Sequence, residues 1–205
     1  SASVGRFKTD ELARRLSEIN PHASIIPHRS IYDRHTADKF ALSEYDYIID
    51  AIDSLSSKVE LIIRASASGA RVITALGASN KLDPTRIKVS SLWDSEHCPL
   101  GRFVRKRLRR RGFRQEVTCV YSDENIPLRE TASQCGSGSC VCPSTGIGPD
   151  GERAPAHEWC SKKKQINGSV VHITGTFGFM IAGIVIQEII DKAYRDLTPP
   201  PSSPQ

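Results

Sequence analysis

The sequence predicts an α/β protein built on a mostly parallel sheet with helices on both faces. Three short apolar segments, at 23–28, 46–50 and 70–76, are rich in β-branched residues and have the composition of buried strands. They alternate with two helical patterns, at 36–42 and 54–69. Alternating strands and helices favour right-handed crossovers, which place successive strands parallel to one another in one sheet.

A surface helix is predicted before this core. In "KTDELARRLSEINP" (8–21), apolar residues recur at helical spacing, Thr9 could cap the helix start, and an Asn-Pro pair stops the pattern. The helix predicted over 54–69 ends at Gly69, a residue type that favours helix termination.

The pattern changes in the middle of the chain. In "DPTRIKVSSL" (83–92), an Asp-Pro turn leads into a short strand that could join the sheet antiparallel. A helix is predicted over 99–111 and a further strand over 116–122, so the sheet has an antiparallel C-terminal extension. The apolar face of this helix is expected to comprise Leu100, Phe103, Val104 and Leu108.

The C-terminal part combines a long loop, an apolar helix and a polar tail. Residues 129–169 lack periodicity and predict a functional or disordered loop. A final helix is predicted over 174–196, and "TPPPSSPQ" (198–205) predicts a disordered tail. The apolar stretch at 173–186 is shorter than the ~20 residues that cross a bilayer, so we expect a buried helix and no membrane partner. Residues 1–197 are then expected to form a single domain.

Composition and charge restrict the class of protein. A hydrophobic content of 39% and a charged content of 25% exclude a wholly disordered chain. No apolar leader with a cleavage site begins the chain, so we expect a cytoplasmic location.

One segment accounts for the net charge of +5. "RFVRKRLRRRGFR" (102–114) contains eight cations and no acid, and it lies largely on the helix predicted at 99–111. Such a run favours contact with nucleic-acid phosphates, and a solvated helix face is the alternative, although such faces usually mix signs. The candidate residues are Arg102, Arg105, Lys106, Arg107, Arg109, Arg110, Arg111 and Arg114.

Six cysteines without a secretion signal favour reduced thiols or a metal site over disulfides. Cys98 and Cys119 are interpreted as ordinary small apolar residues. The other four lie in the predicted loop with an irregular C-x4-C-x-C spacing, so a tetrahedral Zn²⁺ site and free thiols both stay open. These four are Cys135, Cys140, Cys142 and Cys160.

Two aspartates close the strand predicted in "DYIIDAIDS" (46–54). Ionised carboxylates resist burial without a partner, and parallel sheets bind ligands beyond the carboxyl ends of their strands. Asp53 could therefore supply an oxygen ligand to a hard cation such as Mg²⁺. The alternative is that Asp53 or Ser54 caps the following helix. For Asp50 we expect a structural role.

Seven motifs follow one another along nearly the whole chain: "VGRFK", "LARRLSEINP", "DYIIDAIDS", "GASNKLDPTRIKVSSL", "PLGRFVRKRLRRRGF", "CVYSDE" and "GSVVHITGTFGFMIAG". Their order resembles the superfamily of ubiquitin-activating-type adenylating enzymes, which includes the bacterial activators of sulfur-carrier proteins. Within it, the motifs are most similar to the tRNA threonylcarbamoyladenosine dehydratases. The resemblance implies a Rossmann-like fold and a homodimer.

The resemblance also implies roles for individual residues. Lys8 matches the lysine that neutralises phosphate charge as an adenylate forms, and Asp53 matches the acid that meets Mg²⁺ and the ATP phosphates. Lys58 follows Asp53 by one helical turn and could also reach a phosphate. From the residues alone, Lys8 is interpreted as a solvated lysine at a helix start, and a surface position is the alternative for Lys58. Cys160 lies where relatives place a loop cysteine, which raises a nucleophile hypothesis.

The chain departs from the superfamily at its start. It has no strand followed by a G-x-G-G-x-G turn, and it begins at Ser1 in the segment before the third helix of such enzymes. We therefore expect the N-terminal quarter to be missing and ATP binding by the chain alone to be poor.

The implied function is ATP-dependent tRNA modification of the ligase type. In the dehydratases, the carboxylate of threonylcarbamoyladenosine beside the anticodon is activated with ATP and then cyclised with loss of water. This implies ATP, Mg²⁺ and tRNA as partners. One alternative is an adenylating activator of a ubiquitin-like or sulfur-carrier protein, and the other is a catalytically silent RNA-binding or dimerisation module.

Overall fold

The computed structural model describes residues 3, 5–125 and 168–197. The chain divides into two compact units, formed by residues 1–31 with 128–166 and by residues 32–127 with 167–205. The single domain expected over 1–197 stays a prediction. Nearly all of the loop predicted at 129–169 and the whole tail at 198–205 lie outside the described residues.

The first unit contributes one described helix, α1 (Lys8–Ile19). No residue of α1 is buried, which confirms the predicted surface helix, and the helix ends at Asn20 as predicted. Phe7 occupies the N-cap position without a side-chain bond, so the cap expected from Thr9 is wrong. Thr9 lies inside the first turn, where its hydroxyl donates to Asp10.

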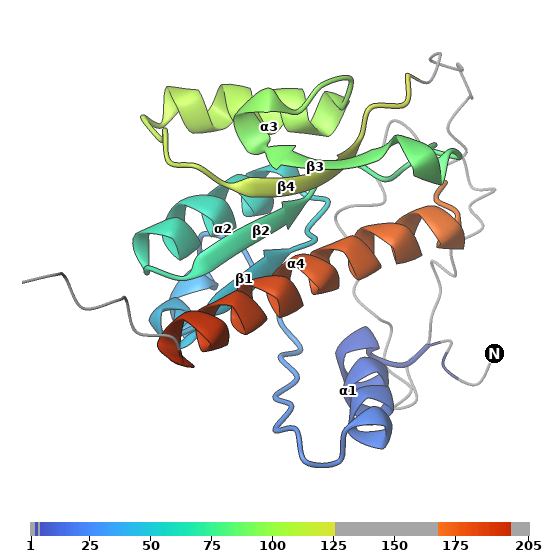
Figure 1. Cartoon of the computed structure of the whole chain (residues 1–205), viewed down its shortest axis with the longest axis vertical. Coiled ribbons are helices and arrows are strands. Elements are labelled where there is room, and N and C mark those ends of the chain that lie inside the picture. The colour runs from blue at the N-terminus through green and yellow to red at the C-terminus, as the bar shows by residue number, and fades with distance from the viewer. Residues whose placement is uncertain (1–2, 4, 126–167, 198–205) are drawn as a thin grey trace, which may run out of the picture. The chain divides into compact units, whose positions relative to one another are not determined.

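A four-stranded sheet forms the centre of the second unit (Figure 1). Its strand order is β1-β2-β4-β3. β1 pairs with β2 and β2 with β4 in parallel, whereas β3 pairs with β4 antiparallel, which confirms the predicted mostly parallel sheet with an antiparallel extension. The strands are β1 (Tyr47–Asp50), β2 (Arg71–Ala75), β3 (Ile87–Ser91) and β4 (Thr118–Ser122).

Two helices, α2 (Leu55–Ala67) and α3 (Pro99–Arg110), cover one face of this sheet. Their apolar residues form a core with side chains from β1, β2 and β4. Both helices were predicted, and α2 ends before Gly69, whose positive φ of 86° suits a residue without a side chain. Phe103 is a correction, because its side chain is 45% exposed while Val104 and Leu108 are fully buried.

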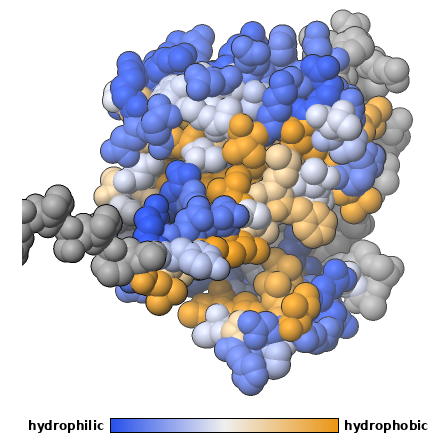
Figure 2. Space-filling model, in the orientation of Figure 1, coloured by the Kyte–Doolittle hydropathy of each residue, from blue (hydrophilic) through white to orange (hydrophobic). Residues whose placement is uncertain are grey.

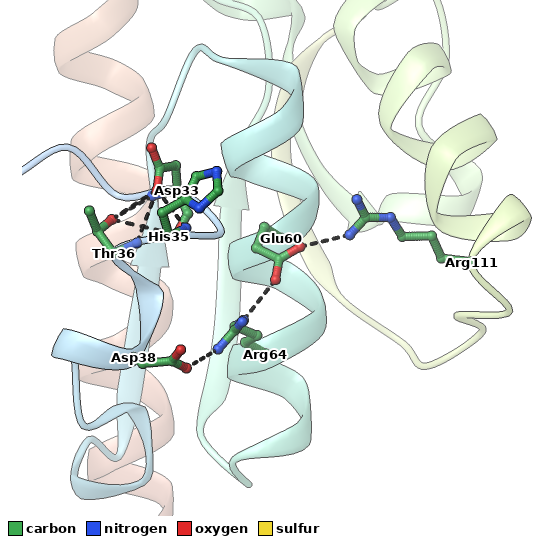
Figure 3. Close-up of polar contacts among 7 residues, drawn as sticks. All are labelled: Asp33, His35, Thr36, Asp38, Glu60, Arg64 and Arg111. Atoms are coloured by element: carbon green, nitrogen blue, oxygen red, sulfur yellow. Dashed lines mark hydrogen bonds and ion pairs between the residues drawn. The ribbon is translucent and has the colours of Figure 1, made fainter.

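Ion pairs link α2 to its neighbours on both sides (Figure 3). Glu60 on α2 accepts from Arg64 and from Arg111, which lies at the end of α3, each at 2.7 Å. Arg64 also pairs with Asp38 at 2.5 Å. These cations hold the pKa of Glu60 below its usual value, because hydrogen bonds from Arg64 and Arg111 favour the charged carboxylate. The network fixes the position of α2, which carries Lys58.

The other face of the sheet is covered by α4 (Val171–Leu197) (Figure 1). Its buried residues Ile173, Phe177 and Ile181 pack against Ile73 and Val120 of the sheet. Helices therefore lie on both faces of the sheet, as predicted.

The helix predicted over 174–196 is confirmed as α4, but its expected burial is wrong. The helix continues past the apolar stretch to Leu197 and contains 27 residues, and only 17% of its most apolar window is buried. By length and composition alone it could span a membrane, which assigns no location. Several large apolar side chains of α4 are exposed, and hydrophobic residues lie at the surface in this view (Figure 2). The exposed apolar side chains of α4 include Phe179, Ile186, Ile189 and Ile190.

Two predicted elements are not formed as expected. Residues 23–28 contain no strand, because Pro27 has no amide to donate to a sheet and Ile26 is 72% exposed. The helix expected at 36–42 is replaced by two single turns, Ala37–Lys39 and Leu42–Glu44. Just before the first turn, the Asp33 carboxylate accepts from the amides of His35 and Thr36 (Figure 3), a local bonding pattern that competes with a longer helix.

Candidate functional site

A buried ion pair joins α2 to the carboxyl end of β1. Asp50 is the last residue of that strand, and its Oδ2 lies 2.7 Å from the Nζ of Lys58. Both side chains are fully shielded from solvent. Unpaired charges are very costly at such a site, so each of these residues requires the other.

The neighbouring strand completes the bonding of this pair. The ammonium of Lys58 also donates to Thr74 Oγ1 at 3.1 Å and to the Ala75 carbonyl at 2.9 Å, and both acceptors lie at the carboxyl end of β2. The Thr74 hydroxyl donates to Asp50 at 2.7 Å, and the second oxygen of Asp50 accepts from the Ile52 amide at 3.0 Å. An ammonium has three donors, and all three are used here.

This geometry corrects the interpretation of Lys58. The surface-lysine alternative is wrong, because Asp50 provides a counter-ion that allows burial. In this arrangement the ammonium also has no donor left for a phosphate. Burial lowers the pKa of Lys58, and the Asp50 carboxylate opposes that shift. The structural role expected for Asp50 agrees with its contacts.

Asp53 lies three residues beyond the end of β1 and is exposed. Ser54 occupies the N-cap position of α2, but no side chain caps that helix, so the capping alternative for Asp53 and Ser54 is wrong. Within the described part of the chain, no hydrogen bond to the Asp53 carboxylate is formed. Its charge favours the protonated form of Lys58, which places it within electrostatic reach of the buried pair. A free carboxylate at a strand end fits an oxygen ligand of a hard cation.

A second buried lysine, Lys81, lies in the loop after β2. It is 4% exposed, and its ammonium donates to the carbonyl of Glu124, which follows β4. The Glu124 carboxylate accepts from the Leu82 and Asp83 amides and fixes the same loop. Burial lowers the pKa of Lys81, and the carboxylates of Glu124 and Asp123 oppose this shift. Two lysines and one exposed carboxylate thus lie in segments that follow the carboxyl ends of parallel strands or pack against them.

The basic residues of α3 and its C-terminal loop differ in how they are bonded. Arg107 donates to Ser56, Arg111 pairs with Glu60, and Arg105 donates to Ser95 and to the Leu92 carbonyl. Arg114 donates to the carbonyls of Arg109 and Phe113, and the Arg109 guanidinium lies over the Trp93 ring. Those contacts are structural.

Four of the eight cationic side chains are exposed on α3 without any hydrogen bond or ion pair to other described residues, and three of them also lack the contact with the Trp93 ring that Arg109 makes. These residues, Arg102, Lys106 and Arg110, are spaced four apart and therefore lie along one side of the helix. We call them the outer stripe. Figure 2 shows a mainly hydrophilic surface at the top of the view, where α3 lies. The described part of α3 contains no acidic residue to neutralise this stripe.

The family model of the ThiF family matches residues 1–203. The chain belongs to the ThiF family. Curated relatives include the tRNA threonylcarbamoyladenosine dehydratase of Bacillus subtilis, 32% identical over 63% of this chain and 51% of the relative. Dehydratase 2 of Saccharomyces cerevisiae is 36% identical over 59% of this chain and 28% of its own length. The Escherichia coli dehydratase is 27% identical over 94% of this chain and 70% of the relative.

Solved structures of the E. coli dehydratase are similar in fold. Its AMP complex superposes with a TM-score of 0.72 at 24% identity, over 95% of this chain and 68% of that one. Its ATP complex gives a TM-score of 0.70 at 23% identity, again over 95% of this chain and 68% of that one. This chain spans about half the length of the B. subtilis relative and about 70% of the E. coli one. The likeness confirms the Rossmann-like α/β fold expected from the sequence.

For two other groups of candidate residues in this ThiF-family chain, the roles inferred from the sequence remain predictions. Lys8 is the exposed first residue of α1 and belongs to the first unit, whereas Asp53 belongs to the second. The cysteines proposed for zinc, and the nucleophile hypothesis for Cys160, fall outside the described residues. Within the described ranges, no group of three potential metal-binding side chains is found.

Sequence reasoning missed Lys81 and misplaced Phe103. Lys81 lies in a loop that directly follows a buried parallel strand. Because parallel sheets bind ligands beyond the carboxyl ends of their strands, this position could have marked Lys81 as a candidate site residue. Cys98 was interpreted as an ordinary apolar residue and is buried, and its sulfur also accepts from the Gly101 amide at the start of α3.

Proposed function

We propose that this chain is part of an enzyme that uses ATP to modify tRNA, by cyclising dehydration of threonylcarbamoyladenosine. The observation that supports this most is the ThiF-family match together with several relatives that are tRNA threonylcarbamoyladenosine dehydratases. Two features of the chain fit that chemistry. Among the residues that the structure describes, the carboxylate of Asp53 beyond a strand end and the cationic stripe of α3 have no hydrogen-bond or ion-pair partner.

The chemistry requires a poor leaving group to be made a good one. A carboxylate oxygen of the modified nucleoside attacks the α-phosphorus of ATP, and pyrophosphate leaves as the mixed anhydride forms. A nucleophilic atom of the same nucleoside side chain then attacks the activated carbonyl carbon and displaces AMP. ATP is thereby converted to AMP and pyrophosphate, and the nucleoside loses the elements of water. The protein contributes alignment and charge neutralisation.

Each candidate residue has a role in this proposal. Asp53 would hold Mg²⁺, which supplies charge neutralisation at the phosphates, and Lys8 would neutralise phosphate charge as the adenylate forms. Lys58 acts indirectly, because it fixes Asp50 and the adjoining strand ends that carry the Asp53 loop. The outer stripe of α3 would contact tRNA phosphates, which carry no sequence information but dominate affinity.

The reaction products distinguish this function from the alternatives. The gene product that contains this chain is incubated with ATP labelled at the α-phosphate and with tRNA that carries threonylcarbamoyladenosine. We expect AMP release that depends on the modified tRNA and a tRNA product lighter by one water. A protein-directed activator would release AMP only with a carrier protein ending in Gly-Gly. A silent RNA-binding module would bind tRNA and release no AMP, and either result would contradict the proposal.

The exposed face of α4 supports a further part of the proposal, a homodimer of a cytoplasmic protein. Its exposed apolar side chains lie beside small residues such as Gly178, whose missing side chain leaves open space for a second copy. Cys98 and Cys119 are both buried free thiols, which suits a reducing compartment.

Substitution on α4 tests this dimer. We expect Ile186→Asp with Ile190→Asp to convert the protein to monomers, because charged side chains would have to be desolvated in the interface. Light scattering during size exclusion measures the mass. Lys192→Asp, on an exposed polar position of the same helix, is the control and should leave the mass unchanged. A monomeric mass for the unmodified protein would contradict the dimer.

A further inference from the structure

Phe103 is a large apolar side chain that α3 leaves in water. Its side chain is 45% exposed, although Val104 and Leu108 of the same helix are fully buried. Burying a phenylalanine side chain is worth about 1.5–3 kcal/mol, so its exposure forgoes stability that the fold could have used. By contrast, the ring of Trp93 lies against Phe113 and under the guanidinium of Arg109.

The surroundings of Phe103 are cationic. The guanidinium of Arg102 lies 5.1 Å from the centroid of its ring. Lys106 and Arg110 follow Phe103 by three and seven residues, so they lie on the same side of the helix as Phe103. Neither side chain is paired with a described residue. On α3 itself, the outer stripe therefore borders the exposed aromatic ring of Phe103.

An exposed aromatic ring bordered by cations favours some polyanionic partners over others. A duplex offers phosphates but keeps its bases stacked inside, and an acidic protein surface offers charge without a flat apolar partner for the ring. An unpaired RNA loop offers both, because its backbone meets the cations while a splayed base stacks on an aromatic side chain. The planar guanidinium of Arg102 lies over the Phe103 ring, so a base can stack on that guanidinium or on the exposed part of the ring.

We propose that Phe103 stacks on an unpaired nucleobase of the tRNA, beside phosphates held by Arg102, Lys106 and Arg110. This inference rests on the proposed function, in which the reacting nucleoside lies beside the anticodon and hence in an unpaired loop. In this proposal, the ring of Phe103 and the outer stripe contribute differently to RNA binding. The stripe gives salt-dependent affinity for any RNA backbone, whereas Phe103 discriminates loops from duplexes.

Binding measurements with two RNA probes test this assignment. Fluorescence anisotropy with the gene product that contains this chain is measured against tRNA and against a fully paired RNA duplex. We expect Phe103→Ala to weaken tRNA binding about tenfold, within the range for loss of one base stack, and to leave duplex binding and the salt dependence unchanged. Phe103→Trp should retain tRNA affinity, because a larger ring still stacks. Thermal melting confirms that each variant is folded.

A double substitution in the outer stripe distinguishes failure of the stacking proposal from failure of the proposed tRNA-modifying function. Lys106→Gln with Arg110→Gln should weaken both probes and reduce the slope of log affinity against log salt by about 0.7–0.9 per lost phosphate contact. If Phe103→Ala binds tRNA like the unmodified protein while the double variant is weakened, stacking is wrong and the phosphate contact stands. If neither variant alters tRNA binding, α3 does not contact tRNA and both assignments fail.

Discussion

Lys58→Met is expected to lower the free energy of unfolding by about 3–5 kcal/mol, the range for breaking a buried ion pair. The substitution leaves the Asp50 carboxylate buried with its Thr74 and Ile52 contacts but without a counter-ion. Because this pair joins α2 to the ends of β1 and β2, its loss also removes the support of the Asp53 loop. Chemical denaturation followed by circular dichroism measures the change.

Two comparisons make this result specific. Arg64→Met removes a cation from the same helix, but its ion pairs with Glu60 and Asp38 are partly solvated, so we expect a loss below about 1 kcal/mol. Adding Asp50→Leu to Lys58→Met removes the orphaned charge and should recover part of the lost stability. Equal losses for Lys58→Met and Arg64→Met would show that the buried pair is not the structural centre of this edge.

Asp53→Asn is expected to reduce tRNA-dependent AMP release by about 10²–10³-fold, the magnitude typical of removing one group that stabilises charge in a transition state. The amide keeps the shape of the side chain but loses the charge that binds a hard cation. Asp53 is exposed and caps no helix, so the melting temperature should not change. Single-turnover assays at saturating tRNA and ATP measure the rate.

The opposite end of the same strand provides the control. Asp46 directly precedes β1 and is also exposed, but it lies at the amino end, away from the carboxyl ends where parallel sheets bind ligands. Asp46→Asn should retain the full rate of AMP release. Equal effects of the two substitutions would indicate a general electrostatic effect rather than a cation ligand.

The sequence predicted the elements that are fixed by local pattern. The β-branched strands at 47–50 and 71–75 form where composition indicated them, and α2 ends where Gly69 permits a positive φ. The segment at 23–28 has similar composition but forms no strand, since strands also need a pairing partner, which composition does not specify.

The candidate site was less accessible from sequence, because charge and burial depend on tertiary partners. Asp53 could be singled out from its place after a strand, but Lys58 resembled a surface lysine until Asp50, Thr74 and Ala75 were seen to surround it. Helical spacing placed Phe103 beside the buried residues of α3, where a shift of one side chain around the helix decides between core and solvent.

The fate of the carboxylate oxygens of the tRNA tests the central claim most directly. Threonylcarbamoyladenosine labelled with ¹⁸O in its carboxylate is supplied in tRNA, and the AMP released by the gene product is examined by mass spectrometry. Attack of the carboxylate on the α-phosphorus predicts that AMP carries one ¹⁸O atom and that the cyclised nucleoside retains the other. Unlabelled AMP, or release of ADP and phosphate in its place, would contradict carboxylate activation by adenylation.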